Sequence, residues 1–242
     1  MEKFGKSQSV TRVEDLRFLT GAGRYVDDIA PKDALHAYVF RSPVAHGVIT
    51  GLDVSEAAAA QGVHLVFTCE DLEAAGVDIA MAGATLKNRD GSPAASPLRP
   101  MLAKGKVALT RGGETLHEEA GDNCAFDWGM GDEDATDAAF KAAAQTVSLE
   151  VGDNRIIVNS IEPRGCYAKW DGTRLHLANN GQGVWVHKGN LVKAFGLDEA
   201  NVRVTNPDTG GAFGMKAMAY PEYFLISHAT RVLASRCAGC RT

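Results

Sequence analysis

The stretch Thr209-Gly210-Gly211-Ala212-Phe213-Gly214-Met215-Lys216 decides how this chain is interpreted. It follows a β-branched segment, residues 202–205, and precedes an apolar run that starts near Ala219. Three glycines in five residues permit backbone angles that other residues avoid, and they let a ligand approach the peptide N–H groups closely. The pattern predicts a turn between strand and helix that holds an anion or a large polar cofactor. A tight turn without a ligand is the alternative that the glycines alone leave open.

Two familiar nucleotide motifs do not fit this glycine loop. A dinucleotide fingerprint needs G-x-G-x-x-G after a strand, but here the three glycine positions are occupied by Thr209, Gly211 and Gly214. A phosphate-binding P-loop ends in Lys followed by Ser or Thr, whereas Lys216 is followed by Ala217. The spacing therefore disfavours an NAD-dependent oxidoreductase, which absence of NAD binding would exclude.

Composition is that of an ordinary globular protein long enough for two domains. The 242 residues are 45% hydrophobic and 23% charged, with a net charge of −5. This charge, without a Lys/Arg cluster in the sequence, argues against nucleic acid as a partner. No apolar run approaches the roughly 18 residues of a membrane span, and the polar first residues lack a signal-peptide core. We therefore expect a cytoplasmic protein without a membrane partner.

Cysteine and histidine positions predict no protein-held metal. The cysteines are Cys69, Cys124, Cys166, Cys237 and Cys240. An odd, scattered set favours reduced thiols over a disulfide framework. The C-x-x-C pair Cys237 and Cys240 has no second ligand pair, so we interpret it as an incidental tail. His46, His187 and His228 have no partners at metal-ligand spacing and are expected to be ordinary surface or core residues.

Periodicity and turn residues predict a mixed α/β (α+β) fold. The predicted strands are residues 35–41, 47–53, 63–67, 146–150, 155–161, 165–170, 174–178 and 202–205. The predicted helices are residues 56–61, 69–75, 135–144, 184–195 and 220–233, with Thr68 as the N-cap of the second and Asp132 or Asp134 as the N-cap of the third. Asp171-Gly172 predicts a hairpin turn between two of the strands. Residues 82–121 are rich in Gly, Pro and Ser, which indicates a functional loop, a linker, or a place where sequence is missing.

Five short motifs, in order along the chain, resemble one family. They are Arg12-x-Glu14-Asp15-x-Arg17-Phe18-Leu19-Thr20-Gly21-x-Gly23-Arg24-Tyr25-Val26-Asp27-Asp28, Arg41-Ser42-Pro43-x-Ala45-His46, Asn159-x-x-Glu162-Pro163-Arg164, Gln182 after a predicted strand, and Gly210-Gly211-Ala212-Phe213-Gly214-Met215-Lys216. Together they resemble the molybdopterin-binding large subunits of the xanthine dehydrogenase, aldehyde oxidase and carbon monoxide dehydrogenase family. The resemblance covers residues 11–233.

The resemblance implies two domains and an oxidoreductase. Residues 1–121 are expected to form an α/β-hammerhead-like domain, and residues 122–242 the N-terminal part of the molybdopterin-binding domain. The family hydroxylates aldehydes, heterocycles or carbon monoxide with water as the oxygen source. Its cofactor is molybdopterin with molybdenum, in bacterial members often the cytosine dinucleotide form. Electrons leave through [2Fe-2S] clusters and FAD, which are expected on partner subunits of a hetero-oligomer.

The resemblance also assigns the site residues. Gln182 matches a glutamine whose amide hydrogen-bonds an oxygen ligand of the metal, and a surface glutamine is the alternative. Phe213 and Gly214 match positions whose backbone N–H groups face the cofactor, although Phe213 could also pack as an apolar plug under the loop. Gly210 and Gly211, with Ala212 beside them, allow the close approach. In this family the pterin dithiolene holds the metal, so no protein ligand is expected.

Charged residues near these motifs have structural explanations as well. Glu162 and Arg164 are expected to form an ion pair, because buried opposite charges usually pair. Lys216 either offers a charge to an anionic ligand or is a solvated lysine at a helix start.

Three departures from the family pattern limit the expected activity. Residues 106–110 run almost directly into residues 113–118 where the family has further strands and a helix, which indicates an internal deletion near residues 104–114. Residues 234–242 do not resemble the family, and the chain lacks a counterpart of the glutamate that acts as general base. We therefore expect the isolated chain to be inactive. The alternative is a non-catalytic assembly or binding module. The substrate is not determined, although Met215 favours the carbon monoxide dehydrogenase-like branch.

Overall fold

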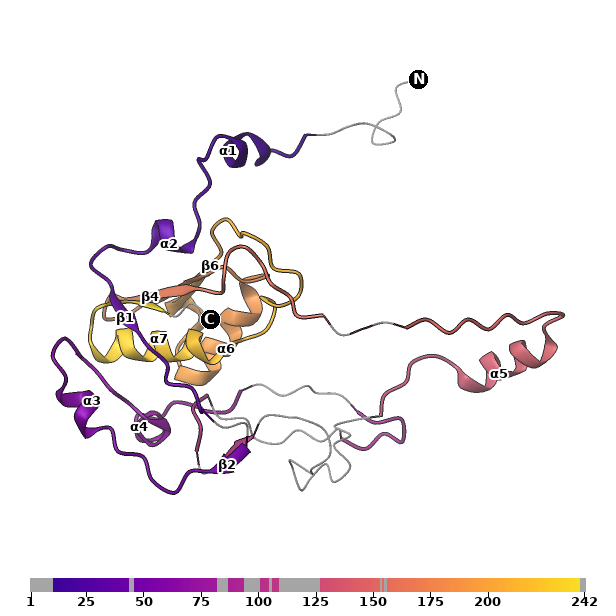
Figure 1. Cartoon of the computed structure of the whole chain (residues 1–242), viewed down its shortest axis with the longest axis horizontal. Coiled ribbons are helices and arrows are strands. Elements are labelled where there is room, and N and C mark those ends of the chain that lie inside the picture. The colour runs from indigo at the N-terminus through magenta and orange to yellow at the C-terminus, as the bar shows by residue number, and fades with distance from the viewer. Residues whose placement is uncertain are drawn as a thin grey trace. The chain divides into compact units, whose positions relative to one another are not determined.

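The computed structural model describes residues 11–43, 46–81, 87–93, 101–104, 106–108, 127–152, 154 and 156–239 (Figure 1). The chain divides into two compact units. The first, called the sheet unit here, comprises Met1–Val39, Asn159–Lys193 and Leu197–Thr242. The second comprises Phe40–Val158 and Ala194–Gly196.

A five-stranded mixed sheet forms the centre of the sheet unit. Its strand order is β1 (Leu35–Ala37), β7 (Arg236–Gly239), β4 (Cys166–Trp170), β5 (Leu175–Asn179) and β6 (Val202–Thr205). The pairs β1–β7 and β5–β6 are parallel, whereas β4 pairs antiparallel with both β5 and β7. The predicted hairpin between β4 and β5 is confirmed. Asp171 accepts hydrogen bonds from the N–H groups of Thr173 and Arg174, and Gly172 takes a positive φ of 97°.

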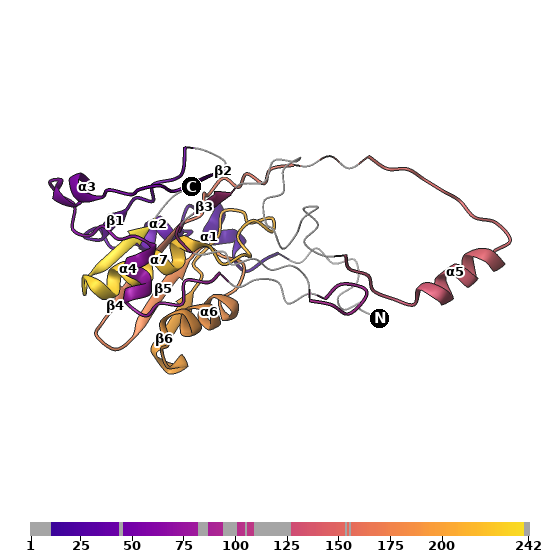
Figure 2. The same cartoon turned by 90° about the horizontal axis from the view of Figure 1, so that it is seen from below.

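Helices connect and cover this sheet. Helix α6 (Trp185–Phe195) joins the parallel strands β5 and β6, which need a crossover of this kind. Helix α7 (Pro221–Val232) starts with proline at its first turn and packs on β4, β5 and β7 (Figures 1 and 2). Two short helices, α1 (Asp15–Leu19) and α2 (Val26–Ile29), precede β1, and the 3-10 helix η2 (Glu199–Asn201) precedes β6.

The core lies between the sheet and helix α7. Its buried apolar residues include Cys166, Ala168, Leu175, Leu177, Val202, Cys237, Phe224 and Ile226. Along β4 these are alternate residues, as expected for a strand with one face against a core. Burial of this apolar face is the main source of stability for the unit.

The described residues of the second unit form a two-stranded antiparallel ribbon and three helices. The ribbon pairs β2 (His46–Val48) with β3 (Lys106–Ala108). The helices are α3 (Ser55–Ala59), α4 (Cys69–Ala74) and α5 (Glu133–Ala142). Thr68 caps α4 through a reciprocal arrangement with Asp71, whose carboxylate accepts from the Thr68 N–H at 2.7 Å. The Asp132 side chain caps α5 by accepting from the Ala135 N–H, as predicted.

Most predicted helices and the hairpin are confirmed, but several predicted strands are wrong. Residues 63–67, 146–150 and the described part of 155–161 form no strand. The side chains of Val147, Leu149 and Ile157 are exposed, so their hydrophobic alternation has no core to face. A strand also needs a neighbour for its backbone hydrogen bonds, and the described residues supply none there.

The interpretation of the C-terminal stretch as an incidental tail is also wrong. Residues 236–239 form β7, which lies between β1 and β4 and pairs with both. Cys237 is buried in the sheet opposite Ala168. A short stretch without sequence periodicity is thus held by its neighbours on both sides. In the described part of the chain, no helix is long and apolar enough to cross a bilayer.

Substitutions at Cys237 test the place of β7 in the sheet. Cys237→Asp puts a carboxylate into the buried core and should lower the free energy of unfolding by about 3 kcal/mol. Cys237→Ala removes only the thiol and should cost about 1 kcal/mol. Chemical denaturation followed by circular dichroism measures both. Equal, small effects of the two substitutions would show that β7 does not pack into the sheet.

Candidate functional site

Gln182 lies directly against the glycine loop. It follows β5, and its Oε1 accepts a hydrogen bond from the Gly214 N–H at 2.9 Å. Its own backbone N–H donates to the Lys216 carbonyl at 3.0 Å. Because the side-chain carbonyl is occupied by the loop, the amide NH2 group is left as a hydrogen-bond donor on an exposed side chain. The structure thus brings Gln182 into contact with the glycine loop, although Gln182 and Gly214 are 32 residues apart in the sequence.

The loop backbone is turned by three residues with positive φ. These are Gly211 at 95°, Phe213 at 48° and Gly214 at 85°. For Phe213 this left-handed conformation is strained and costs about 1 kcal/mol. The Phe213 side chain is 75% exposed, so it does not act as an apolar plug under the loop. The N–H groups of Gly211, Ala212 and Phe213 have no hydrogen-bond partner among the described residues.

A buried ion pair holds the loop at both ends. Lys216 has an exposed fraction of 0%, and its Nζ lies 3.2 Å from Oε2 of Glu162. The same carboxylate oxygen accepts from the Gly210 N–H at 2.7 Å. A Cβ on residue 210 would lie 2.6 Å from the Glu162 Cβ, so glycine is required there for this approach. Lys216 is therefore neither solvated nor free to meet a ligand.

The predicted partners of Glu162 and Arg164 are wrong. Glu162 pairs with Lys216, while Arg164 lies 3.8 Å from the carboxylate of Glu222 on α7. The Arg164 guanidinium stacks 3.5 Å from the ring centre of Tyr220. The Tyr220 hydroxyl in turn donates to the Met215 carbonyl. Two charged residues of one motif, Glu162 and Arg164, thus support the loop through two separate sets of contacts.

The N-terminal motif anchors the start of the loop. The Asp208 carboxylate accepts from the Arg24 N–H at 2.7 Å and pairs with Arg17 at 2.6 Å. The Asp208 N–H also donates to the Arg24 carbonyl at 3.0 Å. Sequence reasoning missed Asp208, and an acidic residue just before the glycine loop was the signal available. The contact explains why two motifs far apart in sequence occur together.

Buried polar side chains lie beneath the turn that carries Gln182. His187 is packed under Gly181, where a Cβ would lie 2.9 Å from its Nε2. His187 also meets the ring of Tyr223 edge-on, with 5.2 Å between ring centroids. Within the described residues, His187 Nδ1 and the Tyr223 hydroxyl have no hydrogen-bond partner. Burial lowers the pKa of His187 and raises that of Tyr223, so both side chains are neutral at pH 7.

The described cysteines and histidines play structural parts. Cys69, Cys166 and Cys237 are buried free thiols, and Cys124 and Cys240 lie outside the described residues. Burial raises the pKa of the Cys237 thiol, which keeps it neutral and unreactive. His228 is buried on α7, and the His46 side chain lies outside the described set. Over the described ranges, no cluster of His, Cys, Asp and Glu is arranged to hold a metal ion.

Comparison with known families identifies the chain. Residues 116–240 match the family model of the molybdopterin cofactor-binding domain, and residues 20–96 match that of the aldehyde oxidase and xanthine dehydrogenase a/b hammerhead domain. The first match covers more than half of the 242 residues. The chain therefore belongs to the molybdopterin cofactor-binding domain family. These matches confirm the predicted family and the predicted α+β fold class.

Curated relatives are large subunits of bacterial enzymes. The chain is 33% identical to the nicotine 6-hydroxylase large subunit of Paenarthrobacter nicotinovorans, with 93% of this chain and 32% of the relative covered. It is 31% identical to the carbon monoxide dehydrogenase large chain of Hydrogenophaga pseudoflava, with 91% and 33% covered. The chain thus spans about a third of the length of these relatives.

Solved structures share the fold. Quinoline 2-oxidoreductase from Pseudomonas putida 86 superposes with a TM-score of 0.71 at 24% identity, covering 97% of this chain and 34% of that chain. A Cu,Mo-containing carbon monoxide dehydrogenase superposes with a TM-score of 0.72 at 24% identity, covering 98% and 35%.

Removing the Lys216 charge tests the buried pair. Lys216→Met leaves the Glu162 carboxylate buried without its cation and should lower the free energy of unfolding by about 3 to 5 kcal/mol. Lys188→Met is the matched control, because Lys188 pairs at 3.1 Å with Glu199, whose side chain is 69% exposed, and should cost less than about 1 kcal/mol. The double variant Lys216→Met/Glu162→Gln should recover part of the loss. Equal denaturation midpoints for Lys216→Met and Lys188→Met would show that the buried Lys216–Glu162 pair does not stabilise the fold.

Stability should fall on mild acidification because of buried histidines. Burial lowers the pKa of His187, and burial together with the nearby Arg203, Arg174 and Lys169 lowers that of His176. Below an ordinary histidine pKa of about 6.5, the unfolded chain binds more protons than the folded chain, so stability decreases as pH falls. The free energy of unfolding should be lower at pH 5.5 than at pH 7.5. His187→Gln should reduce that difference, and an undiminished difference would assign it to other groups.

Proposed function

We propose that this chain is part of the large subunit of a molybdenum hydroxylase and that its glycine loop and Gln182 bind the molybdopterin cofactor. One observation carries the proposal: Gly214 donates to Oε1 of Gln182, which fixes the side chain and leaves its NH2 group as a donor. A neutral donor orients an oxygen ligand of a metal without adding charge. Membership of the molybdopterin cofactor-binding family supports the assignment.

The loop backbone has the chemistry that such a cofactor needs. The N–H groups of Gly211, Ala212 and Phe213 have no partner in the described part of the chain, so they can donate to polar or anionic groups of the pterin. The Phe213 backbone has a strained, positive φ of 48°, and strained backbone of this kind clusters at ligand-binding loops. Gly210 serves the Glu162 contact, and Gly214 aims its N–H at Gln182. The residues present therefore fit the group.

When bound, molybdopterin with molybdenum would supply the chemistry that hydroxylates a small molecule with water as the oxygen source. The chain's own residues hold and orient the cofactor: Gln182 donates to it, and the loop N–H groups donate hydrogen bonds to its anionic groups. Aldehydes, aromatic heterocycles and carbon monoxide are the candidate substrates, because named relatives act on nicotine and carbon monoxide. No counterpart of the family's glutamate base occurs among the matched motifs, so catalysis requires residues from elsewhere.

We propose partners and domains on the same basis. Relatives are named as a large subunit and as subunit gamma of a dehydrogenase complex, which supports a hetero-oligomer. Iron–sulfur and FAD subunits would carry the electrons away, and the cytosine dinucleotide form is the expected cofactor variant. Residues 1–121 form the hammerhead domain and residues 122–242 the first part of the cofactor-binding domain.

Alignment length supports an internal deletion, which we place near residues 104–114 from the sequence. The alignment to the nicotine 6-hydroxylase large subunit spans 259 positions, whereas 93% of the 242 residues is about 225. About 34 aligned positions of that relative therefore have no counterpart in this chain.

A non-catalytic assembly module is the second candidate. The exposed apolar side chains of Leu149, Ile156, Ile157 and Ile161 favour it, because exposed apolar surface commonly marks a contact with another chain. This role and cofactor binding can be separated by measuring cofactor content.

Cofactor content of the purified full chain tests the proposal. Produced in a bacterial host that makes molybdopterin, the wild-type chain should contain molybdenum and pterin, measured by mass spectrometry and pterin fluorescence. Gln182→Ala should reduce the affinity for the molybdenum-loaded cofactor about tenfold, because it removes the donor. Gly214→Ala should lower the content of both, because a side chain is strained at its φ of 85°.

Gly172→Ala is the matched control for Gly214→Ala. Gly172 has a similar positive φ of 97° in the β4–β5 turn, and a Cβ there meets nothing within 4 Å. Its substitution should leave cofactor content unchanged. Wild-type chain without pterin, or equal losses at residues 172 and 214, would refute the proposed site. Oxidation of an aldehyde by the isolated chain would refute the expected lack of turnover.

A further inference from the structure

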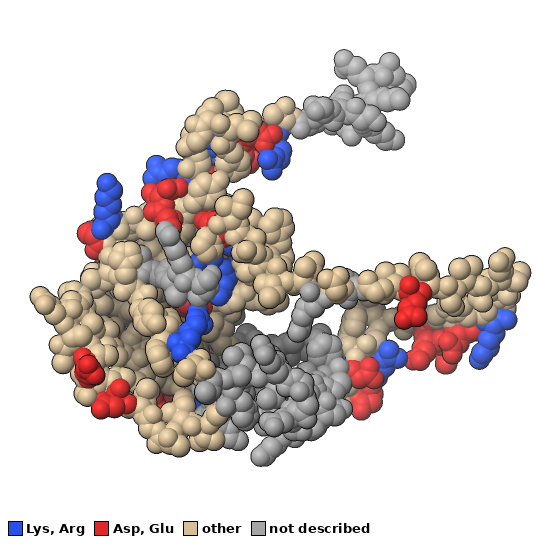
Figure 3. Space-filling view, in the orientation of Figure 1, with Lys and Arg blue, Asp and Glu red and all other residues tan. Residues whose placement is uncertain are grey.

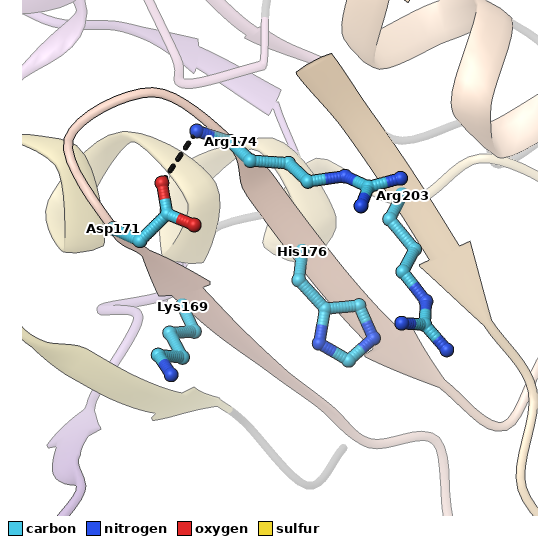
Figure 4. Close-up of a pocket in the computed structure, with 5 residues that line it drawn as sticks. All are labelled: Lys169, Asp171, Arg174, His176 and Arg203. Carbon is cyan, nitrogen blue, oxygen red and sulfur yellow. Dashed lines mark hydrogen bonds between the residues drawn. The ribbon is translucent and has the colours of Figure 1, made fainter. Parts of the chain in front are cut away.

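A row of basic side chains crosses three strands of the sheet. Register places Lys169 of β4 opposite His176 of β5, and His176 beside Arg203 of β6. Arg174, at the β4–β5 turn, extends toward Arg203, and His176 lies between Lys169 and Arg203 (Figure 4). With Asp171 these residues line a cavity of about 190 Å³. We call Lys169, Arg174, His176 and Arg203 the basic row.

The positive charge of this row is not balanced within the described residues. Lys169, Arg174 and Arg203 form no salt bridge in the described part of the chain. The Asp171 carboxylate, which accepts from the N–H groups of Thr173 and Arg174, lines the same cavity and offsets one of these three positive charges. Lys169 and Arg203 flank His176 on the two neighbouring strands, so an anion over this row would meet cations on both sides of the imidazole. Lys, Arg, Asp and Glu are interspersed on the face in Figure 3, and the whole chain has a net charge of −5, so this excess is local.

An aromatic compartment adjoins the basic row. A second cavity of about 260 Å³ shares Arg174 and Arg203 with the first. Its other lining residues are Val184, Trp185, Lys188, Val202 and Val204. The Trp185 side chain is 74% exposed, and the Lys188 Nζ lies 5.5 Å from its ring centre. The ammonium lies over one side of the ring, and an exposed tryptophan is a surface on which a flat aromatic ring stacks.

We propose that the two adjoining cavities together bind a nucleoside phosphate. Guanidinium groups match phosphate oxygens in a fork-like geometry, so Arg174 and Arg203 hold the phosphates with Lys169 beside them. The base stacks on Trp185 in the neighbouring cavity. This site is separate from the glycine loop. Arg174 precedes β5 and Gln182 follows it, and a five-residue strand is about 16 Å long.

Binding of three probes to the full chain tests the site. In titrations followed by calorimetry and tryptophan fluorescence, ADP should bind at least tenfold more tightly than adenosine, and pyrophosphate should bind more weakly than ADP. Arg174→Gln/Arg203→Gln should weaken both phosphate-bearing probes at least tenfold. Trp185→Ala should reduce ADP affinity to that of pyrophosphate and leave pyrophosphate binding unchanged.

Matched controls separate this site from general charge effects and from the cofactor site. Lys32→Gln removes an exposed cation of the same unit outside the row and should leave ADP binding unchanged. Gln182→Ala should also leave it unchanged, because the glycine loop is not involved. Circular dichroism checks that each variant folds, and Lys169→Gln gives a milder test of the row if the double arginine variant unfolds.

Several outcomes would overturn the proposal. ADP that does not bind, or that binds equally to the wild type and to the charge variants, excludes a phosphate site on the row. Loss of ADP binding in Gln182→Ala would place the nucleotide at the glycine loop instead. Polyglutamate that competes with ADP at equal affinity would assign the row to an acidic protein partner.

Discussion

The buried ammonium of Lys216 is the constraint on which the site depends. A charge fully removed from water is tolerated only beside a counter-charge with further hydrogen bonds, and Glu162 supplies both, since it also accepts from Gly210. One carboxylate therefore fixes the first glycine and the last residue of the loop. Between them the backbone forms turns instead of a regular element, and the N–H groups of residues 211–213 have no hydrogen-bond partner among the described residues.

Sheet topology explains why Gln182 meets this loop. Strands β5 and β6 are parallel and adjacent, so their carboxyl ends reach the same edge of the sheet. The residue after β5 and the loop after β6 then lie side by side, as they do at ligand sites of open parallel sheets. Helix α6 makes the crossover, and His187 on that helix packs under Gly181 next to Gln182. Position along the strands, rather than closeness in sequence, assembles the site.

Local signals in the sequence predicted local features. The Asp171-Gly172 turn and the Thr68 and Asp132 caps act within a few residues, and they are found where they were expected. Ion pairs and strand pairings between residues far apart in the sequence could not be predicted from such local signals. Glu162 was paired with Arg164 two residues away, whereas its partner Lys216 is 54 residues distant. Strand β7 carries no periodicity of its own, because its neighbours β1 and β4 determine its conformation.

Some glycines in and near the loop make room for protein side chains instead of a ligand. Gly210 is small so that Glu162 can approach, and Gly181 is small so that His187 fits beneath it. Because Lys216 is neutralised by Glu162, the loop presents backbone dipoles and an amide instead of a net charge. Such a surface suits a polar cofactor held by many hydrogen bonds. The excess positive charge of the basic row lies at the opposite end of β5, where it is suited to a small, highly charged anion.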